Sequence, residues 1–233
     1  MSRETVVVVG LLVAVGVLAV VRGAISPTSV VLIVAVVPAI ILHEVSHGVV
    51  ALAFGDDTAK RAGRLTLNPI KHVDPFGTII LPVLLSLSGL GVFGYAKPVP
   101  VNVARLRHPR NDGLLVSLAG PVTNVLLCFI TVVWVRITHP DFLAFDSGPY
   151  FDRFMFAFGY VNVLLAALNF LPIPPLDGSA LVERALPQAW WPNWLKFRQY
   201  AMPVLIVLVL LRPGALSRLF DPAVHLWIRI LRA

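Results

Sequence analysis

The segment His43-Glu44-Val45-Ser46-His47 combines two histidines and a glutamate at the spacing of a metal site. On a helix, side chains four positions apart lie one above the other, so both imidazoles can bind a single Zn²⁺. The glutamate between them is then placed to take a proton from a metal-bound water molecule. The motif therefore predicts a metal centre that activates water.

The surroundings of this motif strengthen the interpretation. It lies within an apolar run at residues 29–54, and the first 54 residues contain only two acids, Glu4 and Glu44. Ionisable side chains in a membrane-length apolar helix are costly to keep there, so a functional role is the first hypothesis. The alternative is a chance motif, or a polar pair that only joins helices.

The composition is that of an integral membrane protein. Of 233 residues, 58% are hydrophobic and 13% are charged, whereas soluble domains carry about a quarter charged residues. The net charge of +7 does not indicate nucleic acid, because the basic residues fall between apolar runs, as in positive-inside topology. The single cysteine, Cys128, excludes an intramolecular disulfide and a cysteine-based zinc site.

Six segments are candidates for membrane spans, since a span needs roughly 20 apolar residues. Four are strong and two are weaker, the last of which could lie partly in the membrane interface. The first is interpreted as a signal anchor, because no cleavage site follows it. The strong candidates are 5–21, 29–54, 114–137 and 153–171, and the weaker pair is 200–211 and 215–231.

The charge pattern predicts the topology. Basic residues lie on both sides of the glycine-rich apolar piece 76–94, which indicates that both flanks are cytoplasmic and that this piece does not cross. Residues 138–152 contain three aspartates and no Lys or Arg, so they are expected outside, and 183–199 are basic and expected inside. The N-terminus is then cytoplasmic.

The predicted fold class is an all-α polytopic membrane protein with about six transmembrane helices in the plasma membrane. Between the second and third spans, the sequence leaves open a re-entrant or short β element. A single domain is expected over residues 1–233, with the motif-bearing core at about 29–180 and C-terminal helices at about 190–233.

A third metal ligand should come from another segment at the same depth. His47 lies seven residues from the inner end of its span, roughly 10 Å below the cytoplasmic boundary. Asp177 follows three prolines that end another apolar segment near the same face, and it could complete a His₂Asp site with a fourth position for water. The alternatives are that Asp177 caps the next helix, or that His72 or Asp74 is the third ligand.

Three ordered motifs resemble those of the site-2 protease family of intramembrane metalloproteases. They are the His-Glu-x-x-His segment, Ala119-Gly120-Pro121-Val122-Thr123-Asn124, and residues 169–178. The resemblance covers about residues 38–178, and the segments 68–77 and 94–102 look like the family's compact prokaryotic branch without PDZ or CBS domains.

The resemblance implies one Zn²⁺ per chain, bound by His43, His47 and Asp177, with Glu44 as the general acid/base. Asn124 matches an asparagine expected to hold the substrate backbone or the oxyanion, and the alternative is an interhelical hydrogen bond beside Gly120. The expected activity is endoproteolysis of single-span membrane proteins, near the cytoplasmic side of the cell membrane. Because PDZ and CBS modules do not fit in the loops, membrane elements or a membrane adaptor would select the substrate.

Two other functions compete with this interpretation. A transporter for metal ions or protons would need further polar residues through the bilayer, and the spans offer few beyond Thr123 and Asn124. A non-catalytic homologue that only binds membrane helices is disfavoured by the intact Glu44.

Overall fold

The computed structural model describes residues 26–80, 95–138, 149–211 and 213–233. Its regular elements are helices, and no strand occurs in those ranges. The longer ones are α2 (Pro27–Ala53), α5 (Pro109–Thr138), α6 (Tyr150–Asn169), α8 (Trp191–Leu211) and α9 (Pro213–Arg232). The shorter ones are α3 (Thr58–Arg61), η1 (Pro69–His72), η2 (Pro75–Ile80), η3 (Val103–Arg105), α7 (Ser179–Ala185) and η4 (Gln188–Trp190).

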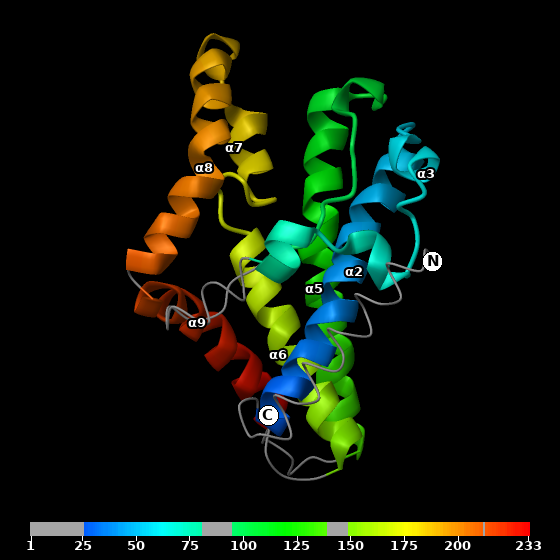
Figure 1. Cartoon of the computed structure of the whole chain (residues 1–233), viewed down its shortest axis with the longest axis vertical. Coiled ribbons are helices and arrows are strands. Elements are labelled where there is room, and N and C mark those ends of the chain that lie inside the picture. The colour runs from blue at the N-terminus through cyan, green and yellow to red at the C-terminus, as the bar shows by residue number, and fades with distance from the viewer. Residues whose placement is uncertain (1–25, 81–94, 139–148, 212) are drawn as a thin grey trace.

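Helices α2, α5 and α6 lie side by side and form the centre of the molecule, with α9 packed against α6 and α8 beyond it (Figure 1). Small side chains bring α2 and α6 close together, because Ala35, Ala39 and Ala157 are fully buried between them. A second cluster joins α5 and α6 to α9 around the buried Trp227. These contacts fix the helices that carry the His-Glu-x-x-His motif and its neighbours.

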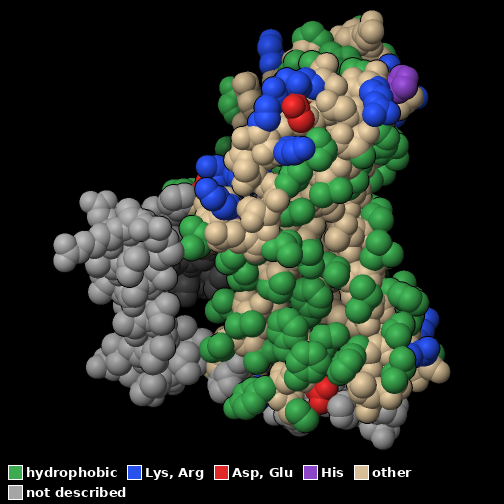
Figure 2. Space-filling view, turned by 90° about the vertical axis from the view of Figure 1, so that its right-hand side faces the viewer, with side chains coloured by type: hydrophobic (Ala, Val, Ile, Leu, Met, Phe, Trp, Pro, Cys, Tyr) green, Lys and Arg blue, Asp and Glu red, His purple; other side chains and the backbone are tan. Residues whose placement is uncertain are grey.

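Three helices are long and apolar enough to cross a membrane: Thr28–Ala53, Pro109–Thr138 and Tyr150–Asn169. Large apolar side chains cover their outer surfaces, including Ile33, Leu126, Phe129 and Ile137, all of them more than half exposed. Figure 2 shows this apolar surface, with most of the Lys and Arg in that view gathered at one end of the molecule. The three spans confirm the membrane character predicted from composition.

The other predicted membrane segments have mixed outcomes. The weaker candidate 200–211 forms the second half of α8, which is not among the three candidate spans found in the described residues. The first predicted span lies outside the described residues. The predicted re-entrant or β piece at 76–94 falls mostly outside them, and its described start forms the short π-helix η2.

The basic end of the molecule is held together by Asp56, which follows the C-terminus of α2. Its side chain is fully buried. One carboxylate oxygen accepts from Thr58 N–H and hydroxyl, and the other accepts from Asn102 N–H at 2.6 Å. Burial alone would raise the pKa of Asp56, but these hydrogen bonds and the nearby Arg105 guanidinium hold that pKa below its ordinary value. Asp56 thereby ties the segment before α5 to the end of α2.

Candidate metal centre

The structure brings the three predicted ligands together. His43 and His47 occupy successive turns of α2, with their Nε2 atoms 3.2 Å apart. Asp177 Oδ2 lies 3.1 Å from His43 Nε2 and 3.4 Å from His47 Nε2. In the described part of the chain, this is the one group of three metal-binding side chains whose ligand atoms lie within 4.8 Å of one another.

Asp177 reaches the histidines because the chain turns sharply after α6. Gly178 N–H donates to Asn169 O at 2.6 Å, which closes the proline-rich turn back onto the end of α6. A Cβ at Gly178 would lie 2.5 Å from the carbonyl oxygens of Phe170 and Leu171, so only glycine fits there. The turn therefore holds Asp177 at a fixed place beside α2.

The far sides of both imidazole rings are held by hydrogen bonds from α2 to α5. His47 Nδ1 lies 2.7 Å from Val116 O, and His43 Nδ1 lies 2.6 Å from Asn124 Oδ1. A carbonyl oxygen can only accept, so His47 carries its proton on Nδ1. In the neutral ring, Nε2 then has a free lone pair.

A chain of amides fixes the same tautomer for His43. Asn162 Nδ2 donates to Phe158 O at 2.7 Å, so Asn162 turns its oxygen toward Asn124. Asn124 Nδ2 donates to that oxygen at 2.7 Å, which leaves Asn124 Oδ1 to accept from His43 Nδ1. Asn124 and Asn162 are both fully buried, so water does not compete for these bonds.

This donor set fits Zn²⁺. Two Nε2 lone pairs and a carboxylate oxygen point into one small space, and Asp177 Oδ2 is buried there without a hydrogen-bond donor among the described residues. With both imidazoles neutral, these three electron-rich atoms repel one another unless a cation lies between them. Two imidazole nitrogens and one carboxylate oxygen, each imidazole held by an outer hydrogen bond, are the ligands of catalytic zinc sites.

Gly120 of α5 leaves the room for the metal. A Cβ at this position would lie 2.5 Å from His43 Cε1 and 2.5 Å from His47 Nε2. Any larger residue would thus occupy the space between the two ligands. The glycine of the Ala-Gly-Pro motif is explained by this close approach.

Glu44 lies at the edge of the same space. Its Oε2 accepts a 2.8 Å hydrogen bond from Val99 N–H. It lines a pocket of about 340 Å³ together with His43 and Asp177, and a second of about 280 Å³ together with His47 and Asp177. Glu44 therefore adjoins both the ligands and open volume in which water and a substrate could bind.

The two alternative third ligands lie elsewhere. His72 is buried, and its Nε2 pairs with Thr66 O at 2.9 Å. Asp74 accepts from Phe76 N–H and Gly77 N–H at the start of η2. Both residues serve the local fold of the segment between α2 and α5.

Comparison with known proteins agrees with this geometry. The model of peptidase family M50 matches residues 135–212. “Putative zinc metalloprotease YwhC” of Bacillus subtilis is 40% identical over 181 residues, which are 76% of this chain and 78% of that protein. “Putative zinc metalloprotease Rip2” of Mycolicibacterium smegmatis is 35% identical over 186 residues, 79% of this chain and 67% of that protein.

The chain belongs to peptidase family M50. An archaeal relative, “Putative zinc metalloprotease MJ0611” of Methanocaldococcus jannaschii, is 30% identical over 153 residues, 65% of this chain and 68% of that protein. No solved structure matches the chain. Membership in M50 confirms the predicted site-2 protease resemblance and the class of enzyme, a metalloprotease.

Sequence reasoning missed Asn162 and the Val116 carbonyl, which support the two histidines of this M50 chain. A backbone carbonyl gives no sequence signal. Asn162 does, because it is a polar residue in the middle of an apolar span, where polar groups usually bind a partner. Asn124 was predicted to hold the substrate or the oxyanion, and that role stays a prediction. In the structure, its amide oxygen contacts His43 and its amide nitrogen contacts Asn162.

Proposed function

We propose that this chain is a zinc-dependent intramembrane endopeptidase that hydrolyses peptide bonds in the transmembrane segments of single-span proteins. The observation that carries the proposal is the cluster of His43 and His47 on the apolar helix α2 with Asp177 in the turn after the apolar helix α6, and with Glu44 beside it. The enzyme would act in regulated intramembrane proteolysis or in the clearance of signal-peptide remnants.

The residues divide the chemistry between them. His43, His47 and Asp177 would hold one zinc ion, which lowers the pKa of a bound water molecule to about 7. Glu44 takes the proton of the attacking water and returns it to the leaving amine. The Val99 N–H bond orients the Glu44 carboxylate for this transfer.

The substrate helix has to unwind first, because a helix hides its carbonyl groups in hydrogen bonds. The segment before η3 offers a place for the extended chain. Tyr95, Lys97 and Val99 donate their N–H groups inward, to Gly77 O, His72 O and the Glu44 side chain. The residues between them include Pro98, which lacks an N–H and lines both pockets beside Glu44. A substrate strand along this edge would donate its own N–H groups to carbonyl oxygens.

The proposed orientation in the membrane is based on the basic end of the molecule. We place that end in the cytoplasm, with about six spans in the plasma membrane and residues 138–152 outside. His47 lies six residues before the end of α2 at Ala53, about 9 Å inside that boundary. The cut is therefore expected in the cytoplasmic half of the substrate span, next to residues such as Gly, Pro, Asn or Ser that weaken a helix.

The substrate is expected to be already shortened on its outer side, because the predicted outer loops are short and a large outer domain would be rejected sterically.

The proposed function is tested with the purified chain. It should cut a single-span substrate within its membrane segment, a chelator should stop the cleavage, and added Zn²⁺ should restore it. Mass spectrometry of the products locates the cut. Cleavage confined to flanking soluble segments, or cleavage that persists after the metal is removed, would contradict the proposal.

A further inference from the structure

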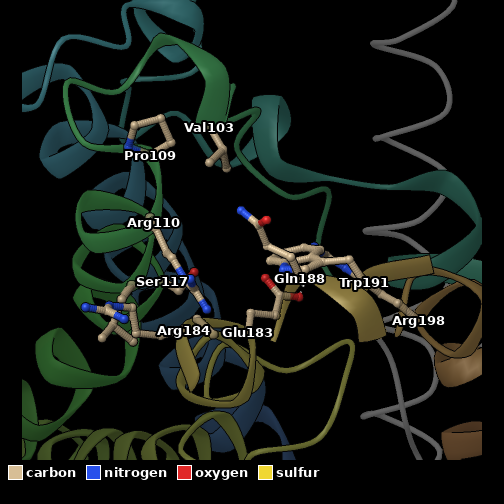
Figure 3. Close-up of a pocket in the computed structure, with 12 residues that line it drawn as sticks. Val103, Pro109, Arg110, Ser117, Glu183, Arg184, Gln188, Trp191 and Arg198 are labelled. Carbon is tan, nitrogen blue, oxygen red and sulfur yellow. Dashed lines mark hydrogen bonds and ion pairs between the residues drawn. The ribbon is translucent and has the colours of Figure 1, made fainter. Parts of the chain in front are cut away.

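A third pocket, which is basic, lies at the N-terminal end of α5, facing α7, η4 and the start of α8. Its volume is about 340 Å³. Figure 3 shows Arg110 and Ser117 of α5 on one side, with Glu183 and Arg184 of α7 below and Trp191 and Arg198 of α8 opposite. Its charged lining residues are three arginines and one glutamate, so the pocket attracts anions.

Hydrogen bonds hold the three arginines in place. Arg110 Nη2 donates to Leu186 O at 2.6 Å, and Arg184 Nε donates to Asn111 Oδ1 at 2.8 Å. Arg198 Nη1 donates to Glu183 Oε1 at 3.0 Å. Each contact occupies one nitrogen of a guanidinium group that has five N–H donors, so the fixed groups keep donors for a ligand.

This basic pocket continues into the metal centre. Val103, Gly113, Ser117 and Arg198 line both it and the pocket that contains Glu44, His47 and Asp177. A chain bound at the metal centre could therefore extend along α5 into the basic pocket. A pocket for a lipid headgroup would have no need of this connection.

We propose that the basic pocket binds an acidic side chain of the substrate, about three residues from the cut; this rests on the proposed function. The register follows from α5. Arg110 lies six residues before Val116, whose carbonyl contacts His47, and six residues of helix rise about 9 Å. An extended peptide covers that distance in about three residues, at roughly 3.3 Å each.

Binding to an inactive chain tests this without cleavage. The zinc-loaded Glu44→Gln chain, in neutral detergent, is titrated with fluorescent single-span peptides that carry Glu or Gln at the second to fifth positions on either side of the mapped cut. Because the arginines are exposed, the expected effect is modest: about five- to tenfold tighter binding of Glu than of Gln at one or two adjacent positions. Equal affinity for Glu and Gln at every position would overturn the proposal, whereas the proposed protease activity would be unaffected.

Variants locate the effect in the pocket. Arg110→Gln with Arg184→Gln should abolish the preference for Glu. Arg184→Glu, which leaves two arginines and two glutamates in the lining, should abolish it as well. Lys196→Gln, which removes one positive charge from α8 outside the lining residues, should retain the preference. A preference that survives in the double arginine variant would overturn the assignment. If the arginine variants changed peptide binding only when anionic lipid was present, the pocket would be a lipid site instead.

Discussion

Replacing Gly120 by alanine should abolish zinc binding while leaving the helix intact. The added Cβ would lie 2.5 Å from His43 Cε1 and from His47 Nε2. Ordinary contacts between such atoms are about 3.5 Å, so the imidazoles would have to move by about 1 Å. Zinc–nitrogen bonds tolerate only about 0.2 Å. Since loss of a mere supporting contact costs about 10- to 100-fold in metal affinity, we expect a loss of at least about a hundredfold.

The matched control is Gly113→Ala on the same helix. A Cβ there would meet Val103 Cγ1 at 3.7 Å and Leu106 Cδ1 at 4.0 Å, which are ordinary contacts. Both changes should favour the helix by up to about 1 kcal/mol, so a general loss of α5 cannot explain a difference between them. Metal content by mass spectrometry, with melting temperatures with and without added Zn²⁺, separates the two variants. A Gly120→Ala chain that binds a full equivalent of zinc with normal affinity would refute the assigned geometry.

Two further changes test the supports of the site. Asn162→Leu should lower zinc affinity about 10- to 100-fold, because His43 is then no longer held through Asn124. The control Thr131→Val also alters a fully buried polar group and should change only the melting temperature. Equal zinc affinity in both variants would contradict the role of the two asparagines. Asp56→Asn should destabilise the fold at pH 7 by about 1–3 kcal/mol, because its amide cannot accept from both Thr58 and Asn102. The folded-state pKa of Asp56 is lowered, so the stabilisation by its carboxylate is present above the unfolded pKa of about 3.9 and is lost as the pH falls through the folded-state pKa. In denaturant unfolding, the difference in free energy of unfolding between wild type and Asp56→Asn should therefore shrink at acid pH. A difference that stays constant with pH would contradict this.

The sequence predicts the parts of the site that depend on local geometry. The i, i+4 spacing of His43 and His47 makes their shared face a property of a single helix. Asp177 could be predicted as well, because three prolines end a span at the expected depth. The three central spans follow from their length and apolar composition alone.

Contacts between helices could not be predicted in the same way. The pair of Asn124 and Asn162 joins residues 38 positions apart, and it depends on how α5 and α6 are rotated against one another. The role of Gly120 likewise appears only when α5 is placed against α2. Arg198 was visible in the sequence only as part of a basic loop, since its position beside the metal centre requires the direction of α8.

The most direct test of the central claim is the cleavage of a single-span substrate by the Glu44→Gln chain, with its zinc content measured in the same sample. The amide keeps the size of the side chain but cannot take the proton of the attacking water. The variant should bind one equivalent of zinc, as the wild type does, and should cut at least about 10²- to 10⁴-fold more slowly. Cleavage at the wild-type rate by this zinc-loaded variant would contradict the assignment of Glu44 as the general base and, with it, the proposed mechanism.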